Sequence, residues 1–242
     1  MFKPNISKIL DAIKPEDKVL DIGGWAQPFN RADYVIDINP YDSRGMLGSC
    51  YPGTERFTKE TWIQRDICDH QPYPFADKFC DYVICSHTLE DVRDPIFVCS
   101  EIIRIGKRGY IEVPSMRHEM TLGVENPRYV GRSHHRWLVD IQKDEIVFTF
   151  KYHHLHSNWK YHFPRTGPRS VDAREEIEFI FWEGEFQYRE QLLITPDEIH
   201  EYFSQYIQKR RAYPAWRDLF ENAKEQVKAL WRSTVGKRNA TR

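Results

Sequence analysis

Small, acidic and polar residues follow four apolar runs in the first third of the chain, at the points where the runs end. They are Asp21, Gly23 and Gly24 after the first run, Asp37 after the second, Asp66 after the third, and Ser86 and His87 after the fourth. If the runs are parallel strands, their carboxyl ends meet at one edge of a sheet, where such folds bind ligands. Glycine also lets the backbone approach a ligand closely. These residues therefore predict a ligand site built at strand ends.

The residue types favour a nucleoside ligand that carries a positive charge. Asp37 can accept hydrogen bonds from both hydroxyls of a ribose, and Asp66 with Ile67 can flank an adenine ring. A carboxylate is unfavourable beside a pyrophosphate but favourable beside a sulfonium or an amino group. A dinucleotide is the less favoured alternative, because Trp25 or Ala26 replaces the third glycine of G-x-G-x-x-G. A purely structural turn is the other alternative.

The chain resembles the class I S-adenosylmethionine-dependent methyltransferases from about Val19 to Ser115. The resemblance rests on the turn VLDIGGWAQPF, the acid near the end of RADYVIDI, the Asp after the third apolar run, and the stretches PYPFADKFCDYVICSHTLEDVRDP and EIIRIGKRGYIEVPS. It implies a Rossmann-like fold, S-adenosylmethionine as the cofactor and methyl transfer as the activity. The cofactor-binding residues that it implies are Asp21, Gly23, Gly24, Trp25, Asp37, Ile38, Asp66, Ile67, Ser86 and His87.

Two departures from the family pattern limit what the resemblance implies. The third glycine is missing, so the turn must take another shape, and the variant GGWAQPF followed by RADYVIDI is similar to sugar-related members. Asp91 stands where many relatives have a histidine, so no base is transferred to that position. The expected acceptor is an oxygen or nitrogen atom of a small molecule, including a sugar or a sugar-linked metabolite.

The stretch GRSHHRWLVD carries candidate acceptor-side residues. A hydroxyl acceptor must lose its proton, which a histidine or a carboxylate can accept. We predict His135 as the base or orienting group, with His134 as the second candidate and Arg136 holding an anionic part of the acceptor. The structural alternative is that the two histidines only hydrogen-bond a loop to the sheet.

The run YHHLHSNWKYH adds His154 to the predicted acceptor side. Its four histidines also suggest a metal site, since imidazole is a common ligand. No cysteine or nearby pair of acids completes a standard ligand spacing, so we expect no metal there. We interpret this run as part of a polar and aromatic lid over the acceptor.

Apolar periodicity predicts an α/β fold: a doubly wound, mostly parallel Rossmann-like methyltransferase sheet with an elaborated C-terminal half. Strand patterns alternate with helical patterns through the first half, which predicts right-handed crossovers between parallel strands. The expected strands of this half are 19–22, 34–38, 62–67, 79–85 and 110–113.

The C-terminal half is expected to consist of hairpins, a lid and terminal helices. Hairpins are predicted at 137–150 and 177–193, and helices after the Thr195–Glu198 capping box and over 215–231. We interpret residues 1–242 as one domain, with a cofactor-binding core (1–115), an acceptor-side insertion (116–194) and C-terminal helices (195–242).

The composition is ordinary for a globular protein. The chain has 242 residues and a formal net charge of -1, so no global field favours nucleic acid or membrane, and neither is expected as a partner. The five cysteines form no C-x-x-C pair, and the first residues lack a signal-peptide pattern. Reduced thiols and a cytoplasmic location are therefore expected.

The C-terminal segment leaves other interpretations open. Basic residues outnumber acidic ones from Lys209 onward, which keeps RNA or protein methylation as an alternative function. An apolar stripe from Trp216 to Trp231 is expected to pack on the core, with packing across a homodimer as the alternative. A third alternative is a protein that binds S-adenosylmethionine without catalysis.

Overall fold

The computed structural model describes residues 1–50, 53–143, 145–164 and 174–210, together with individual positions between 216 and 231. The chain divides into two compact units. The first unit comprises Met1–Pro114, Val139–Phe148 and Ile177–Gln191, and the second comprises Ser115–Leu138, Thr149–Glu176 and Leu192–Arg242. None of the helices in the described residues is both long and apolar enough to span a membrane.

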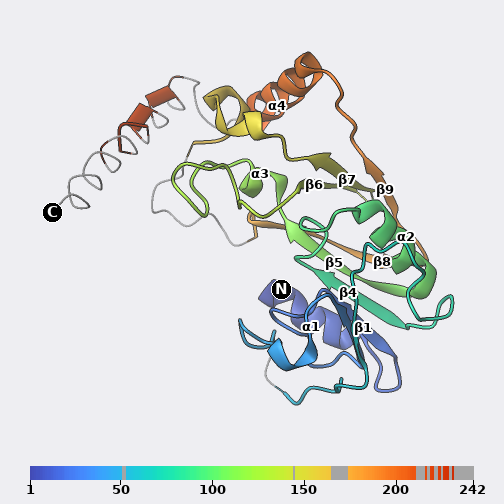
Figure 1. The fold of residues 1–242 in the computed structure, drawn as a ribbon. Coiled ribbons are helices and arrows are strands. Elements are labelled where there is room, and N and C mark those ends of the chain that lie inside the picture. The colour runs from blue at the N-terminus through green and yellow to red at the C-terminus, as the bar shows by residue number, and fades with distance from the viewer. Residues whose placement is uncertain are drawn as a thin grey trace. The chain divides into compact units, whose positions relative to one another are not determined.

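A six-stranded sheet forms the centre of the first unit (Figure 1). Its strands are β1 (Val19–Ile22), β2 (Tyr34–Asp37), β3 (Trp62–Gln64), β4 (Tyr82–Ser86), β5 (Arg108–Pro114) and β8 (Ile177–Glu183). Their order is β3-β2-β1-β4-β5-β8, in which the first five are parallel and β8 pairs antiparallel with β5. The strand order reverses between β1 and β4, which marks the switch point where such sheets bind ligands.

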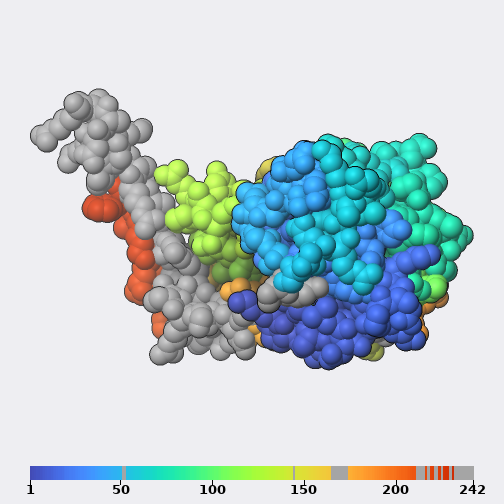
Figure 2. All heavy atoms as spheres, turned by 90° about the horizontal axis from the view of Figure 1, so that it is seen from below, coloured from blue at the N-terminus to red at the C-terminus, as the bar shows by residue number. Residues whose placement is uncertain are grey.

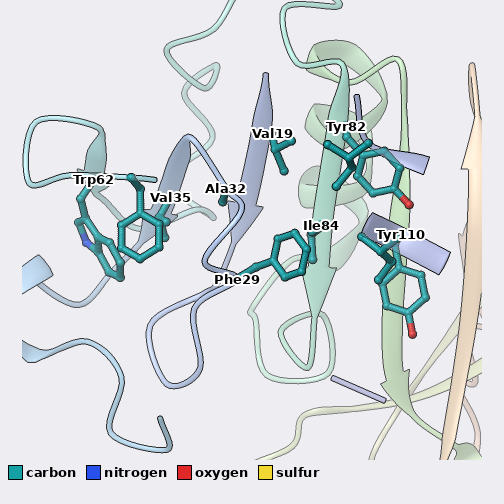
Figure 3. Close-up of a cluster of buried hydrophobic side chains, with 11 residues drawn as sticks. Val19, Phe29, Ala32, Val35, Trp62, Tyr82, Ile84 and Tyr110 are labelled. Atoms are coloured by element: carbon teal, nitrogen blue, oxygen red, sulfur yellow. The ribbon is translucent and has the colours of Figure 1, made fainter. Parts of the chain in front are cut away.

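Helices cover both faces of this sheet, as the doubly wound prediction requires. On one face, Ile9 and Ile13 at the end of α1 (Lys3–Ala12) pack with side chains from alternate strand positions. Figure 3 shows these strand residues pointing to one side: Val19, Val35, Tyr82, Ile84 and Tyr110. On the other face, Cys85 of β4 lies near Cys99 of α2 (Pro95–Ile105). The predicted fold class is therefore confirmed.

The alternation of strands with helices is less regular than predicted. Among the described residues, only α2 stands between two of the parallel strands as an α-helix. The segments that join β1, β2, β3 and β4 are loops with one short 3-10 helix, η1 (Tyr41–Ser43). Figure 2 shows the first third of the chain, in blue to cyan, on one face of the molecule. Side chains that capture backbone groups hold these loops, as when the Asn30 amide donates to Gly53 O at 2.8 Å.

Strand β3 ends at Gln64, three residues before its predicted end. The reason is local turn chemistry. The Asp66 carboxylate accepts the Cys68 N–H and the Asp69 carboxylate accepts the Gln71 N–H, both at 2.9 Å. These Asx-type bonds replace the strand ladder. The start of α2 follows its prediction, since the Asp94 side chain caps the helix by accepting the Phe97 N–H.

The predicted hairpin over 177–193 is wrong, because its two strands join different sheets. Strand β8 belongs to the six-stranded sheet, whereas β9 (Gln187–Glu190) pairs in parallel with β7 (Glu145–Phe150) in a three-stranded sheet. Gly184 has φ +74° and donates its N–H to Lys107 O, so the chain turns away at the sheet edge instead of folding back on β8. The predicted pair at 137–150 is confirmed as the neighbouring strands β6 (Trp137–Gln142) and β7.

The second unit is built from short helices around an apolar cluster. Its elements are α3 (Met116–Glu119), η2 (His153–His156), η3 (Trp159–Tyr161) and α4 (Pro196–Arg210). Met116, Leu155 and Phe203 lie at the centre of the cluster, each wholly buried. The capping box before α4 is confirmed: Thr195 Oγ1 accepts the Glu198 N–H, and the Glu198 carboxylate accepts the Thr195 N–H. Residues 165–173 of the predicted lid, several positions of the last helix and all of residues 232–242 lie outside the described residues.

Candidate functional site

The turn after β1 is built closely around a buried carboxylate. Asp21 is 4% exposed, and its Oδ2 accepts the Phe29 N–H at 2.9 Å. A Cβ at Gly24 would lie 2.3 Å from the same oxygen, so only glycine fits there. Burial raises the pKa of Asp21 to about 7, and the nearby Asp37 charge adds to the shift, while the Phe29 N–H opposes it.

Gly23 is required in the same turn for two reasons. Its φ is +75°, and a Cβ would lie 2.1 Å from Oγ1 of Thr88. Its N–H donates to Ile36 O of β2 at 2.9 Å, which prevents the turn from moving away. The two glycines thus leave bare backbone at the switch point of the sheet.

The end of β2 is fastened to this turn. The Asp37 carboxylate accepts the Trp25 N–H at 3.2 Å and the Asn39 N–H at 2.8 Å. Asp37 is 7% exposed, and burial raises its pKa above the usual range, although these backbone donors oppose the shift. The Trp25 indole donates to Ser43 O at 2.9 Å, so Trp25 also positions η1. Ile38, next to Asp37, has its side chain exposed to solvent.

The two predicted site residues after β3, Asp66 and Ile67, have different environments. Asp66 forms an ion pair with Arg93 at 2.8 Å and accepts the Cys68 N–H. Ile67 is buried, and its carbonyl oxygen accepts a hydrogen bond from the Tyr73 hydroxyl at 3.0 Å. The carboxylate of Asp66 is therefore partly exposed beside a guanidinium, and the side chain of Ile67 is in the interior.

A buried acid joins the ends of β4 and β5. Glu112 is wholly buried, and its carboxylate accepts hydrogen bonds from Ser86 Oγ, Tyr110 Oη and the Phe2 N–H. The His87 ring lies between this acid and another one: Nε2 is 3.0 Å from Glu112 Oε1, and Nδ1 is 3.4 Å from Glu90 Oε1. Neither Glu112 nor Glu90 is among the site residues predicted from the sequence.

The electrostatics of this cluster favour a charged imidazolium. Burial alone would lower the pKa of His87, but hydrogen bonds to Glu112 and Glu90 outweigh it and raise the pKa to about 9. For Glu112, burial is opposed by His87 and Tyr110, which lower its pKa to about 2. His87 also has φ +54°, a conformation that a residue with a Cβ adopts at a cost. The ring is thus held at the strand ends by surrounding structure.

Three of the predicted acceptor-side residues follow one another in the second unit, but their environments differ. His135 is buried, and its Nδ1 lies 3.1 Å from Glu119 Oε1. His134 is exposed, although its ring contacts that of His135 at a centroid distance of 4.5 Å. Arg136 is exposed as well.

Glu119 connects His135 to a buried lysine. Its Oε2 accepts from Lys151 Nζ at 2.9 Å, and Lys151 also donates to Arg132 O. Burial would raise the pKa of Glu119, but His135 and Lys151 lower it to about 2. The sequence does not predict Glu119 and Lys151 as site residues. They lie far apart in the chain, and only the fold brings the two charges together.

The fourth predicted residue, His154, lies in a separate aromatic cluster of the second unit. Its ring centroid is 5.3 Å from those of both Tyr161 and His200 and 5.5 Å from that of Phe203. Burial lowers the pKa of His154 to about 4, so the ring is neutral near pH 7. A neutral imidazole among aromatic rings is suited to packing against a flat or apolar group.

The acids at the strand ends of the first unit define the ligand that this edge accepts. Asp21, Asp37, Glu90 and Glu112 are each less than 9% exposed and lie on or just after β1, β2, β4 and β5. A concentration of buried carboxylates disfavours phosphate groups and favours a cationic ligand. The bare turn at Gly23 and Gly24 gives such a ligand access to the backbone.

One family model matches the part of the chain that carries this geometry. Residues 3–122, just under half of the chain, match the family model described as methionine biosynthesis protein MetW. This range contains the five parallel strands and all of the predicted cofactor residues. No curated protein matched the chain.

Several solved structures show limited similarity. An S-adenosylmethionine-dependent methyltransferase from Mesorhizobium loti is 14% identical over 61% of this chain and 64% of its own, with a TM-score of 0.35. One from Aquifex aeolicus is 16% identical over 46% and 64%, with a TM-score of 0.31. Phosphoethanolamine N-methyltransferase 1 from Haemonchus contortus is 15% identical over 90% and 52%, with a TM-score of 0.37.

This chain spans between half and two thirds of the length of those structures, and the TM-scores are too low to support an argument. The assignment rests instead on the family match, the strand order and the acids at the strand ends. Together they support membership of the class I S-adenosylmethionine-dependent methyltransferase superfamily, which uses S-adenosylmethionine as its cofactor.

Proposed function

We propose that the protein transfers the methyl group of S-adenosylmethionine to an oxygen or nitrogen atom of a small-molecule acceptor. A sugar or a sugar-linked metabolite is the first acceptor class to test, by analogy with similar turns. The observation that carries the proposal is the joined end of β1 and β2, where Asp37 accepts the Trp25 N–H beside two glycines that admit no side chain. This cradle fits a sulfonium nucleoside better than a phosphate-bearing ligand.

The proposed cofactor residues divide by the part of the cofactor that each would bind. Asp37 would accept from the ribose hydroxyls, and exposed Ile38 would cover one face of the adenine. Asp66 and Ile67 would lie at the other end of the adenine, with Asp66 accepting from its amine. Asp21, Gly23, Gly24 and Trp25 would enclose the methionine part, and Ser86 and His87 would complete the site at β4.

The chemistry required of the protein is modest. When bound, S-adenosylmethionine supplies a methyl group that its sulfonium already activates for in-line displacement. The protein must hold the acceptor atom in line and exclude water. His87 is a poor candidate for the base, since both of its ring nitrogens face carboxylates and its pKa is raised to about 9.

For an acceptor hydroxyl, we propose His135 as the group that takes the proton, with Glu119 orienting its ring. Support comes from the 3.1 Å contact between His135 Nδ1 and the buried Glu119 carboxylate, an arrangement that fixes the orientation of the imidazole ring. Arg136 would pair with an anionic part of the acceptor, and His154 would pack against it. An amine acceptor would need the base less.

We also propose a cytoplasmic location. All five cysteines are free, and four of them are buried. Unpaired thiols are typical of proteins in a reducing compartment.

Calorimetric titration with S-adenosylmethionine and with S-adenosylhomocysteine tests the cofactor site. The Asp37→Ala variant should bind at least about tenfold more weakly, since it loses hydrogen bonds to a charged acceptor. Asp81→Ala is the matched control, because Asp81 also accepts a backbone N–H, that of Lys18, but just before β4 begins. Equal affinity of wild type and Asp37→Ala would refute the site.

Turnover then distinguishes an enzyme from a binding protein. Small-molecule acceptors, including sugars and sugar-linked amines, should give S-adenosylhomocysteine above the rate without acceptor. Tight cofactor binding with no turnover for any acceptor class would support the non-catalytic alternative and contradict the proposed activity.

A further inference from the structure

The segment after α4 presents an apolar face to solvent. The described positions between Trp216 and Trp231 are helical. Five large apolar side chains there are 49–67% exposed: Trp216, Leu219, Phe220, Val227 and Trp231. Residues separated by three, four, seven and eleven positions share one side of a helix, so these side chains form a stripe. Figure 2 shows described residues of this segment in red at the surface.

The same segment concentrates positive charge. Residues 209–242 include ten lysines and arginines but only three acids, whereas the whole chain has 35 basic and 36 acidic residues. The charge borders the apolar stripe directly, since Lys224 Nζ lies 4.4 Å from the centroid of the Phe220 ring. A long side chain in this position can extend along an apolar surface and keep its ammonium in a polar layer.

We propose that this segment binds the surface of an anionic lipid bilayer. A helix with tryptophan, phenylalanine and leucine on one face and lysine beside it lies in the membrane interface, with its apolar face among the acyl chains. The basic residues are attracted to anionic headgroups by a field that acts within about a Debye length. Binding at the surface differs from spanning, and it departs from the expectation that no membrane partner exists.

Two other occupants fit these observations less well. RNA is bound largely through contacts of basic side chains with phosphate, so RNA binding would not account for the exposed apolar stripe. A second copy of the segment would cover the stripe but would bring two strongly basic helices together. A bilayer with anionic lipids satisfies both the apolar stripe and the charge.

Vesicle flotation of the full chain tests this proposal. We expect capture by vesicles of phosphatidylcholine with phosphatidylserine, weaker capture by phosphatidylcholine alone, and a decrease with salt. Trp216→Ser/Phe220→Ser should weaken binding roughly tenfold or more, because each aromatic side chain contributes through burial. Leu192→Ser/Ile194→Ser is the matched control, since these apolar side chains are as exposed but lie before α4.

Charge and folding are tested separately. Lys224→Glu/Lys228→Glu should weaken binding to phosphatidylserine vesicles at least about tenfold, and circular dichroism should show that each variant keeps its helix content. The proposal is overturned if wild type does not float with phosphatidylserine vesicles, or if the matched control loses as much binding as the stripe variant. It is also overturned if the segment binds RNA, or forms a dimer that Trp216→Ser abolishes, without vesicle binding.

Discussion

His87 Nε2 lies 3.0 Å from Oε1 of Glu112, a carboxylate without solvent exposure at the end of β5. On its other side the ring meets Glu90, so two buried acids hold one imidazole at the end of β4. This cluster lies at the carboxyl ends of the parallel strands, the edge where doubly wound sheets bind ligands. The two acids raise the pKa of His87 to about 9, so the imidazole is charged at neutral pH. The stability of the fold should therefore depend on pH.

The first prediction concerns stability against pH. The pKa of His87 is about 9 in the folded protein and near 6.5 when unfolded, so its contribution is complete below pH 6.5 and is lost as the pH rises through 9. Because the side chain is 41% exposed, we discount the shift and expect about 1–2 kcal/mol. Urea unfolding of wild type and His87→Gln should therefore differ below pH 6.5 and converge above 9.

The matched control is His134→Gln. His134 is more exposed and lies 3.9 Å from Glu125, so this variant should follow wild type at every pH. A constant difference between wild type and His87→Gln across the range would show that the ion pairs do not stabilise the fold.

The second prediction concerns the turn after β1. Gly23→Ala should destabilise the protein by at least about 3 kcal/mol, since it combines a left-handed backbone with a clash at Thr88. Gly48→Ala separates the two effects, because Gly48 has φ +78° but nothing within 4 Å of an added Cβ. It should cost only about 1–2 kcal/mol. Equal losses in chemical denaturation would contradict the close approach of Thr88.

The cofactor half of the fold could be predicted because its signals are local. Apolar runs end in Asp21 and Asp37, a capping residue and a proline open α2, and the order of these signals defines parallel strands. The partners of β8 and β9 could not be predicted. Both runs read as strands around Gly184, but which edge each one meets depends on contacts with residues far away in the chain, such as Lys107.

The site residues divide in the same way. Position alone predicts Gly23, Gly24 and Asp37 as site residues. The structure brings them to one turn, where the Trp25 N–H next to Gly24 donates to Asp37. Glu112 lies on a strand that is buried on both faces, so a period of two gives no direction for its side chain. The partner of Glu112 in the ion pair is His87, which lies 25 residues earlier in the sequence. Only the parallel register of β4 and β5 brings the two side chains together.

The third prediction concerns the buried charges of the second unit. Glu119→Gln should destabilise the protein by about 3–5 kcal/mol, because it leaves Lys151 and His135 without their anion. Glu125→Gln, at an exposed acid beside His134, should leave the stability close to that of the wild type. Thermal or urea unfolding measures both. Replacing Lys151 by methionine in the Glu119→Gln background should recover part of the loss, and no recovery would contradict a direct pairing of the two charges.

The last prediction separates the two adjacent histidines in catalysis. His135 is buried against Glu119, whereas His134 is exposed and contacts His135 only through its ring. If His135 accepts the proton of a hydroxyl acceptor, His135→Ala should lower kcat by about 10²–10⁴-fold, and His134→Ala should lower it by less than about tenfold. Cofactor affinity, measured by calorimetry, should be unchanged in both variants, and Glu119→Gln should alter the pH profile of kcat while His135 is still present.

Unchanged turnover in His135→Ala with a hydroxyl acceptor would remove the base from the mechanism. A loss of turnover with an equal loss of stability would assign His135 to the structure of the second unit instead.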